Sequence, residues 1–321
     1  MKPEYDLQGK TTMIYRFLEK DDVPKPTLAM DYSYGRKAGK SLIKDVVHVW
    51  EVGHLSSSLI SSAMTGCCLG HSPHHTTILI MLDLSKPQMI WNTLDECLQS
   101  LREAMEISYS TDQLREMRDR KIENLQSGSS STTIPNTSSI FPMRLCLIGG
   151  RYDEFRSRFD EDERQLIGQT LRAAALTLGA ALHYHSAKDS QLLRRTKEML
   201  SSYGFKGQQP TRSNATDYDS ALWLGAGCDS ADAIGSQFGR AARTSLDAIK
   251  KVLESRQPWP PQISPRFDER SVGILDSSLR KDEFAEPLVD RMALQREQEI
   301  SVLLRDMLEA PPTTVPVPGP Y

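Results

Sequence analysis

The sequence contains no long hydrophobic run. Its longest uninterrupted apolar stretch, residues 78–82, has five residues, whereas a membrane-spanning helix needs about 20. A secretory signal is not evident either, because residues 1–10 are polar and include Pro3, Glu4 and Asp6. We therefore expect neither membrane insertion nor secretion.

An excess of charge of one sign is missing as well. The 321 residues include 39 Lys or Arg and 42 Asp or Glu, which gives a net charge of −3. No positive excess is available to attract nucleic acid or acidic lipid over the whole molecule. We therefore expect no nucleic-acid partner.

Cysteine is rare and irregularly placed. An odd number of cysteines, two of them adjacent, does not make a disulfide framework and indicates reduced thiols in an intracellular protein. The protein is therefore expected to be soluble and cytosolic. The five cysteines are Cys67, Cys68, Cys97, Cys146 and Cys228.

The hydrophobic pattern alternates between short apolar runs and segments of helical period. Hydrophobic residues make up 39% of the chain, enough for one large domain with appended segments. The alternation, from Gly9 to about Ser186, predicts βαβ units around a mostly parallel sheet. The predicted strands are residues 28–34, 46–50, 77–83, 144–149 and 181–185. The predicted helices are one that begins at Lys10, one over about 90–105, and one over 161–178 that ends at Gly179.

Proline, serine and threonine mark the boundaries between parts of the chain. We assign residues 1–256 to the α/β domain and interpret its Ser/Thr-rich segment 126–139 as a mobile insertion. Repeated proline predicts an extended linker over 257–286, because proline opposes regular helix. A helix is predicted over 287–309, with Pro287 in its first turn, and a disordered proline-rich tail over 310–321.

The tetrapeptide Gly9-Lys10-Thr11-Thr12 is the second half of a phosphate-binding P-loop. In such a loop backbone N–H groups cradle phosphates, the lysine pairs with the outer phosphates and the threonine after it holds Mg²⁺. The full motif requires a glycine where this chain has Glu4, whose carboxylate would repel phosphate. It also follows a strand, and only eight residues precede Gly9. Alone, the tetrapeptide is equally typical of an ordinary helix start.

Two further fragments of the small-GTPase pattern follow in the expected order. Thr27 stands just before a predicted strand, where these enzymes carry the threonine of their first switch. Gly53 ends the stretch Trp50-Glu51-Val52-Gly53, which takes the place of Asp-x-x-Gly. The glycine N–H of that motif contacts the γ-phosphate and its aspartate reaches Mg²⁺, but Trp50 cannot coordinate a metal.

Two fragments of a base-recognition site lie at the ends of the next strands. Asp153 stands where an aspartate would accept hydrogen bonds from guanine, whereas Gly150, at the start of that motif, offers no side chain. Ser186-Ala187-Lys188 matches the loop that closes over the base. The order of all these fragments predicts a Ras-like P-loop fold that does not hydrolyse GTP efficiently.

Two histidine-containing stretches are candidates for chemical sites. His54 follows Gly53, where GTPases place a water-orienting residue, but without the metal-linked aspartate we interpret it as an exposed loop residue. A cluster of cysteine and histidine invites zinc, yet neighbouring ligands point apart and cannot easily share one tetrahedral ion, so a polar loop is favoured. The cluster comprises Cys67, Cys68, His71, His74 and His75.

Several stretches that fill the loops of the predicted fold carry a family resemblance. They are residues 23–36, the Trp50-Glu51-Val52-Gly53 stretch, and residues 82–87, 149–155 and 226–230. Together they resemble the dynein light intermediate chain family, from about residue 9 to about residue 300. The segment 284–292 is similar to the C-terminal segment of the dynein 2 members, which favours dynein 2 over dynein 1.

The resemblance implies a non-catalytic accessory subunit of cytoplasmic dynein 2. Its implied partners are the tail of the dynein 2 heavy chain and other dynein 2 subunits, and its implied role is retrograde intraflagellar transport and cilium assembly. The implied locations are the cytoplasm, the cytoskeleton, the cilium and the basal body. No cofactor is required by this role, and the candidate that remains is GTP or GDP, bound weakly.

Two alternatives stay open from the sequence: an active or nucleotide-switching Ras-like small GTPase, and an adaptor unconnected to dynein. The first strand of the Ras-like fold and half of its P-loop are expected to be missing. Because that strand would be central in the sheet, its loss would leave free edges on the two strands beside it.

Overall fold

The computed structural model describes residues 9–25, 27, 29–38, 44–53, 73–127, 137–205, 214–256, 291–292, 294–296 and 298–302. The chain divides into two units, Met1–Ile263 and Ser264–Tyr321, and the account below concerns the first. The predicted linker over 257–286 and the tail over 310–321 lie outside the described residues.

The main sheet of the first unit has four strands. These are β3 (Thr77–Asp83), β4 (Arg144–Gly150), β5 (Ala181–Tyr184) and β6 (Trp223–Leu224), in the order β3-β4-β5-β6. The first three strands are parallel, which confirms the predicted mostly parallel sheet. Strand β6 pairs antiparallel with β5 and was not predicted, because two residues are too short to show a period.

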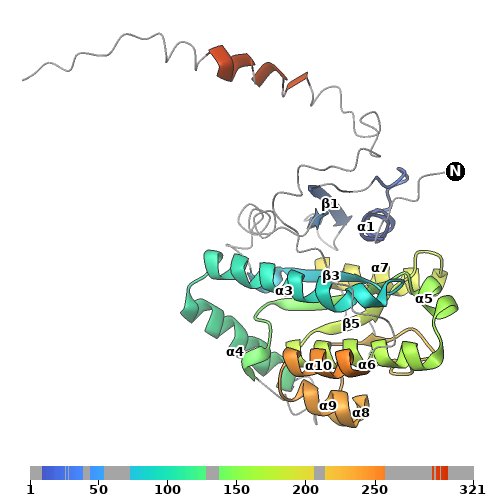
Figure 1. Ribbon diagram of the computed structural model, residues 1–321. Coiled ribbons are helices and arrows are strands. Elements are labelled where there is room, and N and C mark those ends of the chain that lie inside the picture. Colours follow the sequence, from blue (N-terminus) through green and yellow to red (C-terminus); the bar gives the residue numbers. More distant parts are fainter. Residues whose placement is uncertain are drawn as a thin grey trace, which may run out of the picture. The chain divides into compact units, whose positions relative to one another are not determined.

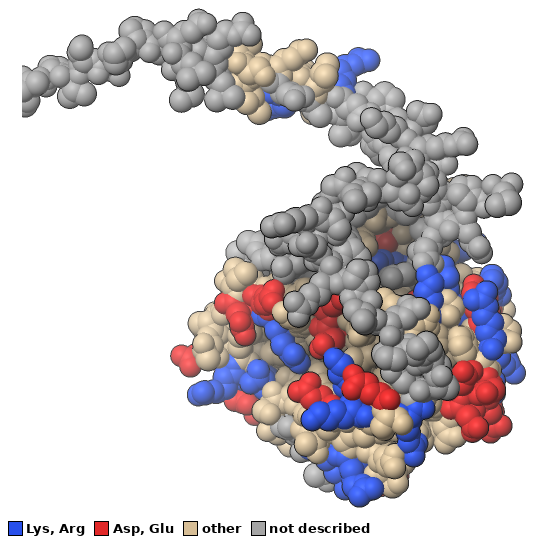
Figure 2. Space-filling model, viewed as in Figure 1, with Lys and Arg blue, Asp and Glu red and all other residues tan. Residues whose placement is uncertain are grey.

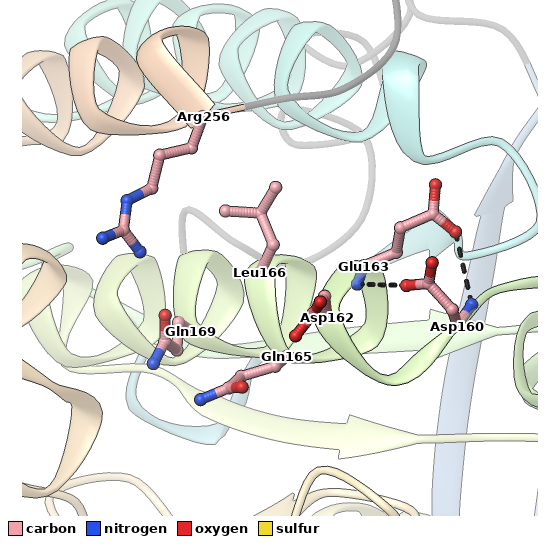
Figure 3. Close-up of a pocket in the computed structure, with 7 residues that line it drawn as sticks. All are labelled: Asp160, Asp162, Glu163, Gln165, Leu166, Gln169 and Arg256. Atoms are coloured by element: carbon pink, nitrogen blue, oxygen red, sulfur yellow. Dashed lines mark hydrogen bonds between the residues drawn. The ribbon is translucent and has the colours of Figure 1, made fainter.

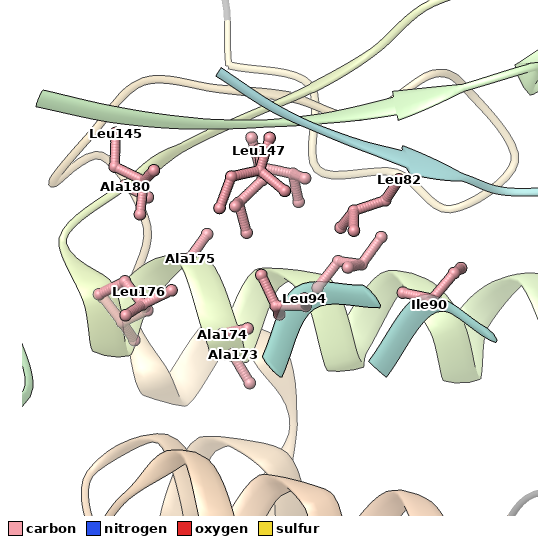
Figure 4. Close-up of a cluster of buried hydrophobic side chains, with 14 of the residues drawn as sticks. Leu82, Ile90, Leu94, Leu145, Leu147, Ala173, Ala174, Ala175, Leu176 and Ala180 are labelled. Carbon is pink, nitrogen blue, oxygen red and sulfur yellow. The ribbon is translucent and has the colours of Figure 1, made fainter. Parts of the chain in front are cut away.

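One face of this sheet packs on helices α3 (Pro87–Ser108) and α6 (Glu161–Leu178). Leu82, Leu147 and Leu94 lie in one buried cluster with the alanines of α6 (Figure 4). Small alanine side chains let α6 approach the strands closely, so the leucines fill the space between strand and helix. This cluster is the principal core of the unit.

The opposite face packs on helices α1 (Lys10–Leu18) and α7 (Ser190–Gly204). Successive strand residues point to opposite faces, so Met81 and Ile148 join Met13 of α1 in a second, smaller cluster. Helix α1 is therefore held against the sheet, and its N-terminus carries the predicted phosphate-binding tetrapeptide.

Three short helices after β6 lie outside α6 (Figure 1). They are α8 (Ala231–Ile234), α9 (Ser236–Ala242) and α10 (Leu246–Arg256). Phe238 and Ile249 bury their side chains in the principal core. These helices were not predicted from the sequence.

Helix α6 is the element that its local sequence specifies best. Asp160 accepts a hydrogen bond from the Glu163 backbone N–H, and the Glu163 side chain accepts one from Asp160, which forms a capping box (Figure 3). The helix ends at Gly179, whose φ of 61° is left-handed, as predicted.

The structure corrects the two ends of the predicted insertion over 126–139. Helix α4 (Thr111–Ser127), which was not predicted, continues through the first two of these residues. A short 3₁₀ helix covers Thr137–Ser139, and residues 128–136 lie outside the described part of the chain. A further short helix, α5 (Tyr152–Arg158), occupies a segment expected to be a loop.

A separate two-stranded antiparallel ribbon consists of β1 (Met30–Ala38) and β2 (Lys44–Val52). Both strands are longer than the predicted 28–34 and 46–50. In the Ras-like order the missing strand would lie between β2 and β3, and among the described strands none joins these two. The expectation about the first strand itself concerns residues 1–8, which lie outside the described residues.

Candidate functional site

The N-terminus of α1 carries the first group of predicted site residues. Gly9 caps the helix with a φ of 82°, a left-handed conformation that favours glycine, and its carbonyl accepts the Met13 N–H at 2.9 Å. Lys10 is half-buried at the first helical position, Thr11 is buried and Thr12 is half-buried. The tetrapeptide thus begins a helix, as both interpretations of it required.

The Thr11 hydroxyl does not face open space. It donates a hydrogen bond of 2.8 Å to Oε1 of Glu51, and the Thr27 side chain hydrogen-bonds to the same carboxylate. Glu51 is only 5% exposed. The structure therefore brings Thr11 and Thr27 together at Glu51, an acidic residue that the sequence analysis did not single out.

Strand alternation explains why Glu51 is in the site and Trp50 is not. Neighbouring strand residues point to opposite faces, so the Trp50 ring lies on the other side of the ribbon, with its centroid 4.7 Å from that of Tyr32. Trp50 therefore points away from the site. The carboxylate of the next residue, Glu51, reaches Thr11, which the sequence analysis did not predict. The signal available in the sequence was the acidic residue itself within Trp50-Glu51-Val52-Gly53.

Burial dominates the electrostatics of this group. It raises the pKa of Glu51, opposed by the Thr11 hydrogen bond and by the positive charge of Lys10. It also lowers the pKa of Lys10, opposed by the negative charge of Glu51. The lysine and the carboxylate are therefore close enough to stabilise each other's charge in a partly desolvated place.

Gly53 lies directly after β2. Its N–H donates a hydrogen bond of 2.8 Å to the Ala29 carbonyl, next to the start of β1. The glycine N–H that would contact a γ-phosphate is therefore engaged by the backbone of the ribbon.

The second group of predicted residues comes together at the carboxyl ends of β4 and β5. Ser186 Oγ donates to Asp153 Oδ1 at 2.7 Å, and Lys188 Nζ lies 2.9 Å from Asp153 Oδ2. Burial raises the pKa of Asp153, but the hydrogen bonds from Lys188 and Ser186 outweigh it and hold the pKa below its usual value. Ala187 lies between these two residues and is exposed.

The chemical capacity of the two groups follows from these contacts. A Mg²⁺-bound nucleotide would need Lys10 and the Thr11 and Thr27 hydroxyls, which here surround Glu51. A guanine base would need both carboxylate oxygens of Asp153, which Ser186 and Lys188 also contact. In this arrangement the donors of the first group face Glu51, so Mg²⁺ and phosphate would have to displace that carboxylate, whereas Asp153 keeps acceptor capacity for a base.

The remaining sequence candidates are His54 and the cluster of cysteine and histidine. His54 and the cluster members Cys67, Cys68 and His71 lie outside the described residues. His74 is described, and its Nε2 lies 2.7 Å from Arg120 Nη1. Within the described part of the chain, no three His, Cys, Asp or Glu side chains gather as metal ligands would.

One face of the first unit shows how its surface charges are distributed. On the face in Figure 2, Lys and Arg are interspersed with Asp and Glu. A hollow of about 510 Å³ lies beside the N-terminal half of α6 (Figure 3). It is lined by Asp160, Asp162, Glu163, Gln165, Leu166, Gln169 and Arg256, which include none of the predicted site residues. None of the helices that the structure describes has the length and apolarity needed to cross a membrane.

The architecture has a counterpart among solved structures. It matches the crystal structure of the conserved domain of a dynein light intermediate chain with a TM-score of 0.57, covering 78% of this chain and 89% of that one. At 19% sequence identity this likeness establishes the fold alone. The protein is thus an α/β domain protein in which a mostly parallel sheet is flanked by helices.

Sequence relatives define the family. Cytoplasmic dynein 2 light intermediate chain 1 of Danio rerio is 30% identical over 94% of this chain and 84% of its own length. The proteins of the same name from Bos taurus and Homo sapiens are 33% and 32% identical, each over 91% of this chain and 83% of their own length. No family model matches the chain. The chain belongs to the dynein light intermediate chain family.

Proposed function

We propose that this protein is a non-catalytic accessory subunit of the cytoplasmic dynein 2 motor. In this role it binds the heavy-chain tail together with other dynein 2 subunits, and it supports retrograde intraflagellar transport and cilium assembly. Its places of action are the cytoplasm, the cytoskeleton, the cilium and the basal body. The observation that carries this proposal is the similarity to dynein 2 light intermediate chains over nine-tenths of the chain.

The contacts within the candidate site support a scaffold role for this protein, built on a degenerate Ras-like P-loop fold. Glu51 engages Thr11 and Thr27, and Asp153 is engaged by Ser186 and Lys188. Because these groups bond to one another, we expect the protein to act by binding partners through its surfaces and not by catalysis. Helix α1 stays attached to the sheet through the Met13 cluster, which needs no ligand.

Capture from ciliated cells tests the partner. A tagged full-length chain is expected to recover the dynein 2 heavy chain, and cells without the chain are expected to accumulate transport particles at ciliary tips. Recovery of other proteins without any dynein subunit would favour the adaptor alternative.

GTP turnover tests the catalytic alternative, an active or nucleotide-switching small GTPase. We expect no turnover above background by the purified protein, with or without Mg²⁺, because the donors of the site are already engaged. A turnover that depends on Lys10 and equals the intrinsic rate of small GTPases would establish the enzyme instead.

A further inference from the structure

Three groups that a small GTPase directs at Mg²⁺ and phosphate, two from its P-loop and one from its first switch, are directed here at one side chain. The Thr11 hydroxyl donates to Glu51 Oε1 at 2.8 Å, the Thr27 side chain also bonds to that carboxylate, and the Lys10 ammonium acts on it electrostatically. These residues come from three separate parts of the chain: the start of α1, the segment before β1 and the end of β2. Their convergence on a buried carboxylate is a property of the fold and not of one local turn.

We propose that Glu51 is a built-in anion that takes the place of a Mg²⁺-bound diphosphate at the N-terminus of α1. The carboxylate supplies the negative charge that this helix terminus and Lys10 attract, and it accepts the threonine hydrogen bonds. The fold is thereby completed without nucleotide, and a diphosphate can enter only by displacing Glu51.

Charge balance favours this assignment over a metal site. One lysine and one carboxylate sum to no net charge, so the group has no excess negative charge to attract a cation. Mg²⁺ is instead bound by one or two carboxylates together with substrate phosphates. Glu51 is 5% exposed, and its Oε2 has no hydrogen-bond partner among the described residues. A carboxylate buried in this way needs a neighbouring positive charge, and Lys10 provides it.

The inference is independent of the heavy-chain proposal, because it concerns how the first unit holds its own P-loop helix. A protein that failed to bind dynein could still carry this internal anion. A dynein subunit could equally hold a nucleotide at this site.

Nucleotide affinity of a charge-neutral variant is the direct test. The full chain and Glu51→Gln are titrated into a fluorescent GDP analogue, with and without Mg²⁺. Removing the internal anion is expected to tighten binding by about tenfold or more, the factor that corresponds to one buried charged hydrogen bond. Asp45→Asn is the matched control, because it removes one charge from the same strand at an exposed position, and it should leave the affinity unchanged.

The direction of the change decides between the two roles of Glu51. If Glu51→Gln weakens Mg²⁺-dependent binding, the carboxylate serves a metal and the proposal is wrong. Equal affinity of Glu51→Gln and the unaltered chain, including no binding by either, also overturns it.

A second measurement needs no ligand. Urea unfolding gives the free energy of unfolding of Thr11→Val, of Glu51→Gln and of the double variant. The internal contact predicts that the losses of the two single variants add up to more than the loss of the double variant. If Glu51→Gln does not fold, Thr11→Val with Glu51→Leu replaces both partners by apolar groups and should recover the fold. Strictly additive losses, or failure of that apolar pair to fold, would contradict the internal anion.

Discussion

At the residue scale, the most deeply buried charge of the described chain is Arg172, in the middle of α6. It is 2% exposed and makes two hydrogen bonds of 2.8 Å to the carboxylate of Asp229. Its guanidinium also donates to Tyr218 Oη at 2.7 Å and to the Thr216 carbonyl at 3.4 Å. These bonds attach the segment that contains β6 to the principal core, because all the partners of Arg172 lie just before or after that strand.

Replacing Arg172 is therefore expected to destabilise the whole unit. Arg172→Met leaves Asp229 buried without its partner, a change that typically lowers the free energy of unfolding by about 3–5 kcal/mol. Urea unfolding followed by circular dichroism measures this loss. Arg243→Met is the control: its ion pair with Asp232 is 2.6 Å long but exposed, so the loss there should stay at or below about 1 kcal/mol.

Two buried histidines at the end of β5 predict how stability depends on pH. Burial lowers the pKa of His183 to about 3 and that of His185 to about 4, both from 6.5. The unfolded chain then binds protons before the folded one as the pH falls. The free energy of unfolding is therefore expected to decrease from about pH 6.5 downwards, by roughly 2 kcal/mol per histidine between pH 7 and pH 5.

Urea midpoints at pH 7 and pH 5 test this dependence. His183→Phe keeps a ring against Trp223, whose centroid lies 4.0 Å from that of the histidine, and it should reduce the loss by about half. The matched variant His75→Phe alters an exposed histidine and should leave the loss as it was. An equal loss in all three proteins would show that the buried histidines are not responsible.

At the scale of elements, the ribbon and the main sheet are joined by helices. Gly35 of β1 lies so close to Leu18 of α1 that a Cβ there would stand 2.8 Å from its Cδ2, and one at Gly204 of α7 would stand 2.6 Å from Val47 of β2. The ribbon thus packs on α1 and α7. Strands β2 and β3 each pair with one described strand only, so each presents an edge.

These edges predict aggregation. We expect the chain to be prone to association in solution, since unpaired backbone groups of a strand pair readily with another molecule. Adding an apolar strand before Gly9 should fill the place between β2 and β3 and raise the soluble yield. Sedimentation and soluble yield are the measurements, and a chain that unfolds cooperatively as a monomer at an ordinary mesophile midpoint would refute the idea.

At the scale of the whole molecule, the two units differ in what they can contribute to binding. All described strands and both buried clusters belong to the unit Met1–Ile263. The described part of the other unit is helical, with Met292, Leu294, Ile300 and Val302 all more than half exposed. We propose that the principal heavy-chain contact lies in the first unit and that the predicted helix over 287–309 makes a secondary contact.

Deletion of everything after Arg256 tests this assignment. Helix α10 ends at that residue, so the cut leaves every described element of the first unit intact. Capture of the dynein 2 heavy chain should survive the deletion. Loss of capture by a truncated protein that remains folded by circular dichroism would make the C-terminal segment the principal binding element.

The sequence by itself determined the elements that local patterns specify. The apolar run 77–83 became β3, the acidic start and terminal Gly179 of α6 set its two ends, and Lys10 begins α1. The group formed by Asp153, Ser186 and Lys188 was also predictable, because parallel strands bring their carboxyl ends to one edge. For the single elements the information lies within a few residues of the feature, and the group of Asp153, Ser186 and Lys188 needs only the parallel course of β4 and β5.

Only the tertiary structure decided what joins distant parts of the chain. Thr11 and Glu51 are 40 positions apart, and Arg172 and Asp229 are 57 apart, so no local period connects them. The short strand β6 exists because β5 offers it an edge. Glu51 faces α1 because strand alternation turns Trp50 away, and its role as the occupant of the P-loop arises from burial beside Lys10, which depends on the packing of α1.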